Sequence, residues 1–253
     1  MRATSALDKQ KEKIVAASKN QLLNTKIQRA CAWSGLVGVI IFFMGFVIPG
    51  WIPLPPPSMT QEQVVAMYQQ NLVNIRIGGI LFFISSIFLP PMVAVISIQL
   101  KRIEGANPIL AYTQLSAGSI NIVFFIATGL LFLMTAFRPD RPPELIYLMN
   151  DISWFVAVMV WPAAFTQNIA IAVAILNDQS DEPVFPRWVG FFNIWASLLF
   201  IPGSLVPFFT QGPFAWSGII GFWVPATAFG IWFLVMLPML LRAIKHQATG
   251  YST

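Results

Sequence analysis

The chain has 253 residues, of which 57% are hydrophobic and 10% are charged, and its mean hydropathy is +0.70. A water-soluble domain cannot bury that much apolar surface, so the composition excludes a soluble globular protein and indicates a polytopic membrane protein. The net charge of +5 resides in residues 1–29, where basic residues precede the first apolar segment. Because nothing in the chain forms a basic groove with stacking aromatics, we expect no nucleic-acid partner.

Residues 1–31 form a basic cytoplasmic leader in which apolar residues are interspersed with lysines. Two interpretations remain open for it: an interfacial helix on the inner headgroups, or a solvated tail. Since this leader is about 30 residues long before any apolar run begins, it does not read as a secretory signal. We therefore expect the first apolar segment to be retained as an anchor.

Six apolar segments follow, and none contains Lys, Arg, Asp, Glu, His or Cys. Each exceeds the roughly 20 residues that cross about 30 Å of hydrocarbon, and lipid offers the backbone no hydrogen-bond partners, so each is predicted to be a helix. The predicted fold class is an all-α bundle of six transmembrane helices, forming one domain over residues 32–245 with a tail at 246–253. The predicted spans are 32–54, 77–100, 110–136, 152–176, 188–210 and 215–241.

The basic residues are distributed unequally between the two sides of the predicted membrane domain. Twelve of the 15 Lys and Arg residues fall in the leader, in the second and fourth turns, and after the last span, whereas Arg76, Arg138 and Arg141 fall on the other side. The positive-inside rule therefore places both termini in the cytoplasm. This pattern is typical of a multi-pass protein of a bacterial-type cytoplasmic membrane, with the lipid bilayer around it.

The connection between the first two spans carries a second kind of helix signal. Residues 53–57 read Pro-Leu-Pro-Pro-Pro, which cannot continue a helix. Thr60 and Gln63 then have the spacing of a capping box. The apolar residues that follow at helical spacing predict a short amphipathic helix on the outer surface, and they are Val64, Tyr68, Leu72 and Ile75.

Tryptophans occur at the ends of the predicted spans. Because their amphipathic rings favour headgroup depth, we expect an interfacial belt rather than a functional cluster. Its members are Trp33, Trp51, Trp154, Trp188 and Trp216.

The spans lack the residues that most membrane chemistry requires. The only His is His246 and the only Cys is Cys31, both outside the interior of the spans, so we expect no cofactor and no metal site. No ionisable residue lies at membrane depth, which disfavours carboxylate-driven transport. A serine nucleophile elbow, a phosphate-binding loop and a zinc signature are all absent, so the sequence argues against an enzyme without excluding one.

Prolines interrupt several spans and supply one indication of a binding site. Pro90 lies in the second span and Pro202 in the fifth, and each removes a helix hydrogen bond and bends its helix. If the chain consists of two inverted halves of three spans, residues 88–91 correspond to 200–203, and broken helices at matching positions mark a central site. Ordinary kinked packing is the alternative.

Polar side chains at membrane depth supply the second indication. Asn121, Gln167 and Asn168, with Trp161 nearby, can line a mostly apolar cavity and orient a ligand in it. Hydrogen bonds between helices are the alternative role for these amides. The predicted ligand-binding residues are Asn121, Trp161, Gln167, Asn168, Pro90 and Pro202.

A group of charged residues on the predicted outer side forms a candidate mouth to the bundle. It consists of Arg76, Arg138, Asp140, Arg141, Glu144 and Asp151. Either its arginines and carboxylates pair and fasten the loops over the span ends, or they bind a headgroup and supply acid and base.

These observations favour a protein without cofactor that binds or passes a small apolar or amphipathic molecule through a kinked helix bundle. Two alternatives from other classes remain. One is an accessory or assembly subunit whose apolar faces pack against a larger membrane complex or a second copy of the chain. The other is a membrane enzyme that acts on lipid headgroups through the outer carboxylates.

Overall fold

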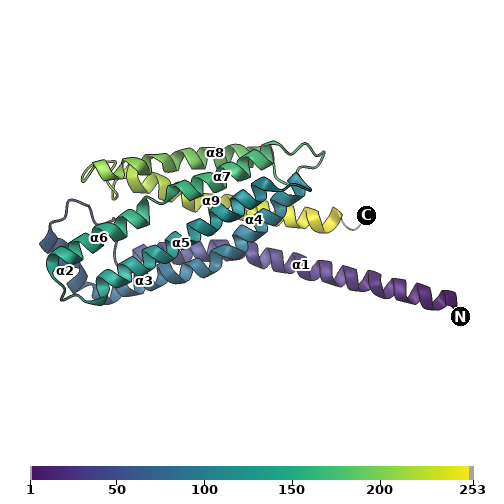
Figure 1. Ribbon diagram of the computed structural model, residues 1–253, viewed down its shortest axis with the longest axis horizontal. Helices are drawn as coiled ribbons and strands as arrows, with labels where there is room; N and C mark the ends of the chain where they lie inside the picture. The colour runs from purple at the N-terminus through teal and green to yellow at the C-terminus, as the bar shows by residue number, and fades with distance from the viewer. Residues whose placement is uncertain (1, 251–253) are drawn as a thin grey trace.

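The structure is a computed structural model that describes residues 2–250, with side chains described over residues 21–249. Over these residues the chain is helical and contains no strand, and six of its helical segments are long and apolar enough to cross a membrane, as predicted. The segments pack into one elongated bundle (Figure 1). Both chain ends lie at one end of it, here called the terminal end, and helix α2 lies at the other, the α2 end.

The first span belongs to helix α1, Arg2–Val47, which runs without a break through residues 2–31 of the predicted leader. The predicted end at residue 54 is seven residues too late, because the chain turns at Gly50, whose φ of 73° favours glycine. Trp51 N donates to Phe46 O at 2.9 Å and folds residues 48–54 back onto the helix end.

The second span is preceded by α2, Gln61–Gln70, and is itself divided into α3, Leu72–Ser85, a short 3₁₀ helix η1, Ser86–Phe88, and α4, Leu89–Glu104. The capping box is present as predicted, with Thr60 N donating to Gln63 Oε1 at 2.8 Å and Gln63 N donating to Thr60 Oγ1 at 3.4 Å. Val64 and Tyr68 are buried in α2, whereas Leu72 and Ile75, predicted on the same helix, belong to α3.

The third span is α5, Ile109–Phe137, and the fourth consists of α6, Pro143–Val158, and α7, Trp161–Leu176. Glu104 caps the start of α5 by accepting from Leu110 N and Ala111 N at 2.8 and 2.7 Å. The fourth span was predicted to begin at residue 152, after Asn150 and Asp151, but the helix begins nine residues earlier and contains both. Asn150 is buried there, and Tyr68 OH donates to its Oδ1 at 3.4 Å.

The last two spans are also irregular. The fifth is α8, Arg187–Phe200, continued by the 3₁₀ helix η2, Ile201–Phe208, and the sixth begins with a π-helical turn, η3, Ile219–Trp223, before α9, Val224–Gly250. The predicted bounds, 188–210 and 215–241, therefore match the α-helical parts only approximately. The changes of helix type coincide with Pro202 and Pro225, which cannot donate a helix hydrogen bond.

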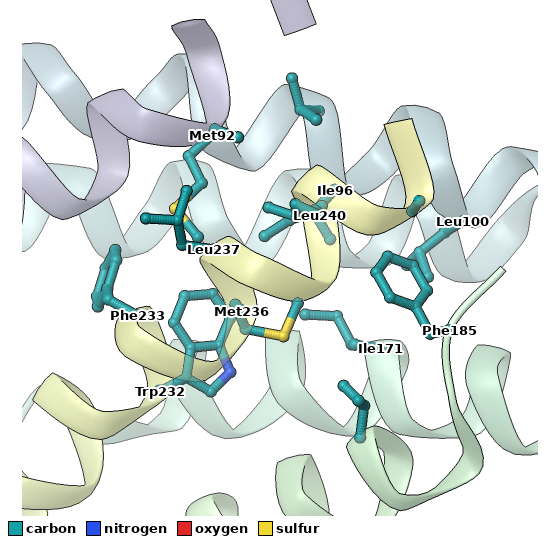
Figure 2. Packing of buried hydrophobic residues seen from close by; sticks show 14 of the residues in the cluster. Met92, Ile96, Leu100, Ile171, Phe185, Trp232, Phe233, Met236, Leu237 and Leu240 are labelled. Atoms are coloured by element: carbon teal, nitrogen blue, oxygen red, sulfur yellow. The ribbon is translucent and has the colours of Figure 1, made fainter. Parts of the chain in front are cut away.

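Buried apolar side chains form two cores, one at each end of the bundle. In the terminal-end core, α9 inserts Trp232, Met236 and Leu240 between the neighbouring helices, where they meet Ile96 of α4 and Ile171 of α7 (Figure 2). The core at the α2 end is rich in aromatic residues and includes Phe46, Trp51, Phe82, Phe132, Trp154, Trp216 and Phe222.

The predicted tryptophan belt is wrong for three of its five members. Trp33 and Trp188 are half exposed, at 50% and 51%, but Trp51, Trp154 and Trp216 are buried in the core at the α2 end. The ring of Trp154 lies 5.1 Å from that of Trp51 and stacks on that of Trp216 at 6.3 Å. Aromatic neighbours from distant parts of the chain therefore replace the headgroup environment that the sequence suggested.

Candidate functional site

An apolar cavity of about 130 Å³ lies between the two cores. The interruption of the fourth span faces it through Val158, Val160 and Trp161, and the start of the sixth span faces it through Phe222 and Pro225. The irregular backbone of these two spans thus surrounds a space instead of packing helix against helix. The remaining lining residues are Phe42, Phe43, Phe46, Asn121, Phe125, Ala157, Ala164, Phe200, Gly221, Ala226 and Phe229.

A second, smaller cavity of about 40 Å³ adjoins the first on the side of the terminal-end core. The two cavities share the lining residues Asn121, Phe125, Ala164, Phe200 and Phe229, so only side chains separate them. The smaller one is lined in addition by Leu89, Met92, Val93, Ile96, Gly118, Ile122, Gln167, Asn168, Trp232 and Phe233. We refer to the two together as the joined cavities.

Three carboxamides form the polar side of the joined cavities. Asn121 Nδ2 on α5 donates to Gln167 Oε1 on α7 at 3.0 Å. Asn168 is only 4% exposed, yet its side chain has no hydrogen-bond partner among the described residues. A buried amide without a partner costs free energy, so Asn168 is the one amide of the three whose position protein contacts do not explain.

Helix packing sets the position of these amides. Trp161, Ala164 and Asn168 recur at helical spacing on one face of α7, and Gly118, Asn121 and Phe125 do so on α5. At Gly118 a Cβ atom would come within 2.6 Å of Val93 Cγ1 and 3.1 Å of Gln167 Nε2. The absence of a side chain there lets α5 approach closely enough for Asn121 to reach Gln167.

The joined cavities carry no charge. Within the part of the chain that the structure describes, their lining contains no Asp, Glu, Lys, Arg or His. An ion inside them would lose its hydration without gaining a counter-charge, which is expensive in a low-dielectric interior. The site can hold an uncharged molecule by packing and a few hydrogen bonds.

Of the predicted ligand-binding residues, the structure brings four to the joined cavities: Asn121, Trp161, Gln167 and Asn168. Pro90 and Pro202 line neither cavity. Pro90 is exposed at the start of α4, and Pro202 is half-buried in η2. Each proline lies where its span changes between 3₁₀ and α-helix, next to η1 for Pro90 and within η2 for Pro202.

The charged group at the α2 end forms backbone contacts rather than ion pairs. Arg76 donates to Ala136 O and Phe137 O at 3.0 to 3.1 Å, and Arg141 donates to Met134 O at 3.0 Å. These carbonyls end α5, where the helix dipole favours a cation. Arg138 lies over the Phe137 ring, 5.7 Å from its centre.

The carboxylates of this group are spread along the chain. Asp140 and Glu144 are exposed and form no hydrogen bond or ion pair within the described residues, while Asp151 lies inside α6 and accepts from Asn150 Nδ2 at 3.4 Å. None of the six charged residues lines either of the joined cavities. Their contacts give the headgroup-enzyme alternative no support.

The sequence analysis missed most of the aromatic lining. Phe42, Phe43 and Phe46 face the larger cavity from α1, and Phe125 and Phe229 face it from α5 and α9. The rings of Phe42 and Phe125 lie 4.6 Å apart, and those of Phe46 and Phe222 lie 5.5 Å apart. The signal available was the spacing of 42 and 46 on one helix face, which 22 phenylalanines in the chain obscure.

Six helical segments that are long and apolar enough to cross a membrane support the class of multi-pass membrane proteins for this chain. No protein-family model, no curated protein and no solved structure matches it. Any more specific activity must therefore be argued from the joined cavities themselves.

Proposed function

We propose that this protein binds or passes a small apolar or amphipathic molecule, without a cofactor, and that the joined cavities are its binding site. In this proposal the protein lies in a bacterial-type cytoplasmic membrane with both termini in the cytoplasm. The α2 end then faces outward, with α2 on the outer surface and the charged group Arg76, Arg138, Asp140, Arg141, Glu144 and Asp151 around the mouth.

One observation supports this proposal above the others: the buried, unpartnered carboxamide of Asn168 beside an uncharged cavity. Ligand sites of this kind are mostly apolar and carry a few placed polar groups that orient the ligand. Asn193 is the contrasting buried amide, because its Oδ1 accepts from Trp232 Nε1 at 2.9 Å and it lines neither of the joined cavities.

The proposal is tested by uptake or binding of small apolar compounds in vesicles that contain the purified protein. Asn168→Leu should weaken binding at unchanged expression, and Gln167→Leu should do so too because it also releases Asn121. Asn193→Leu is a poor control because it removes the hydrogen bonds of Asn193 to Val189 and Trp232. Thr166→Val is a better one, since Thr166 lies on the exposed face of α7. Equal binding by the Asn168 variant and the wild type would contradict the proposal.

A second candidate, the accessory subunit, is favoured by a groove on the outside of the bundle. The groove has a volume of about 640 Å³ and lies between α5 and α7, with Ile109, Tyr112, Ile120 and Phe124 along one side and Pro162 and Ala163 along the other. A partner helix or a second copy could pack there. Purification in mild detergent separates the candidates, since a partner in fixed stoichiometry supports the subunit and a homogeneous single species supports the binder.

A further inference from the structure

The size, charge and polar groups of the joined cavities narrow the ligand to one chemical class. This inference rests on the proposed function. The larger cavity, at about 130 Å³, is close to the roughly 150 Å³ of an engineered apolar cavity that holds benzene. Together with the adjoining 40 Å³, the space fits a six-membered ring with one or two further heavy atoms.

The lining favours a ring over an open chain of equal volume. Aromatic side chains from α1, α5 and α9 surround the larger cavity, with Phe125 and Phe229 rings 6.0 Å apart and Phe42 and Phe125 rings 4.6 Å apart. A compact ring can contact several of these faces and edges at once and has few rotatable bonds to immobilise.

The polar side of the site offers hydrogen-bond donors. Helix α7 begins at Trp161, in the middle of the fourth span, and no side chain caps its N-terminus. The first N–H groups of a helix have no partner within it, and this end carries a partial positive charge, although Pro162 in this turn has no N–H to donate. Trp161 and Ala164, from this first turn, both line the larger cavity.

Asn168 supplies the independent second observation. It lies two turns further along the same face of α7, is 4% exposed, and has a carboxamide without a partner in the described chain. Gln167 uses its Oε1 to accept from Asn121, which leaves its amide nitrogen as a further donor at the same place. A ligand that presents an acceptor oxygen satisfies these groups, whereas a hydrocarbon leaves them unpaired.

We infer that the joined cavities take a compact, uncharged ring compound that carries one acceptor oxygen of the carbonyl type, with the ring among the phenylalanines and the oxygen toward the donors of α7. The absence of charged lining residues excludes a carboxylate or an ammonium form of the same compound.

Three probes of similar shape test this class: cyclohexanone, methylcyclohexane, which lacks the acceptor, and cyclohexylamine, which is a cation at pH 7. Equilibrium dialysis of each radiolabelled probe against protein-containing and empty lipid nanodiscs separates bound ligand from ligand dissolved in lipid. With affinities referred to the concentration of each probe in the lipid of empty nanodiscs, cyclohexanone should bind saturably, one per chain, and at least about tenfold more tightly than methylcyclohexane, as expected for one hydrogen bond. Cyclohexylamine should show no saturable binding.

Two neighbouring alanines of α7 provide matched variants. Ala164 lines both cavities, whereas Ala163 lines the groove on the outside of the bundle. Ala164→Phe should abolish binding of cyclohexanone, and Ala163→Phe should leave it unchanged. If Ala164→Phe aggregates in size-exclusion chromatography, Ala164→Val replaces it, because valine fills less of the cavity. Asn168→Leu should weaken cyclohexanone about tenfold and leave methylcyclohexane unchanged.

The outcomes separate the ligand class from the proposed function. One outcome is that Ala164→Phe abolishes saturable binding but cyclohexanone and methylcyclohexane bind with equal affinity. This result overturns the requirement for an acceptor oxygen, while the joined cavities remain a binding site. Saturable binding of cyclohexylamine would overturn the requirement for an uncharged ligand, while the joined cavities would remain a binding site. If no probe binds above the empty nanodiscs, or if Ala163→Phe and Ala164→Phe reduce binding equally, the ligand class and the function of the joined cavities both fail.

Discussion

Replacing two buried asparagines by leucine should have opposite effects on stability, because only one of them has partners. Asn193 donates to Val189 O at 2.8 Å and accepts from Trp232 Nε1 at 2.9 Å, so Asn193→Leu leaves a buried indole N–H unpaired. Hydrogen bonds between membrane helices contribute about 0.6 to 1.7 kcal/mol, and an orphaned buried donor costs about 1 to 3 kcal/mol. We expect a loss of about 1 to 2 kcal/mol in the free energy of unfolding.

Asn168→Leu removes no hydrogen bond to the described residues and replaces a buried, unpaired amide by an apolar group of similar size. We therefore expect stability to stay the same or to rise by up to about 1 kcal/mol. Unfolding by sodium dodecyl sulfate in mixed micelles, followed by far-ultraviolet circular dichroism without added ligand, measures both variants. If Asn168→Leu destabilises the protein as much as Asn193→Leu does, Asn168 has a packing role and the argument for a ligand amide is refuted.

Three further predictions concern other parts of the bundle. Gly129→Ala would put a Cβ 2.7 Å from Gly79 O and from Phe83 N, so α3 and α5 must separate. We expect a loss of about 1 to 3 kcal/mol in the free energy of unfolding in the same assay. Unaltered stability would contradict the close approach of the two helices. Arg76→Gln removes hydrogen bonds from the end of α5 and should speed amide hydrogen exchange at 134–138, with Arg138→Gln as the control that leaves exchange slow. Burial raises the pKa of Tyr68, so the folded chain keeps that proton more tightly than the unfolded chain, whose tyrosines ionise near a pKa of about 10. Stability should therefore be constant up to about pH 10 and fall above it, and absorbance at 295 nm of Tyr68→Phe should match the wild type through that range. A smaller absorbance in Tyr68→Phe than in the wild type below about pH 11 would contradict the raised pKa of Tyr68.

Hydropathy alone predicted the six spans, since membrane crossing depends on length and apolar content, but span boundaries depend on tertiary contacts. Asn150 and Asp151 read as a polar loop, yet Asn150 is buried in α6 because Tyr68, 82 residues earlier, bonds to it. In the same way, Trp51 and Trp154 read as interfacial residues because the sequence does not show that their rings meet at 5.1 Å. Pairings between distant residues leave no trace in local periodicity.

The candidate site was partly predictable for a related reason. Amides are rare at membrane depth, so Asn121, Gln167 and Asn168 stood out, and the helical spacing of Trp161 and Asn168 placed them on one face of α7. The phenylalanines did not stand out, because any apolar residue suits a membrane span. Pro90 and Pro202 indicated where spans two and five lose regularity, but a proline's position in sequence does not show whether it lines a cavity.

The two cores meet only around the joined cavities, and the fourth span changes from α6 to α7 at Met159–Val160, at that same level. Each half of the molecule therefore has its own core, and the joined cavities lie between the two cores. A shift of one half relative to the other would alter the capacity and access of the chamber while leaving the interlocked side chains on either side undisturbed. The boundary between the two cores is therefore the place where the bundle can change shape without disrupting either core.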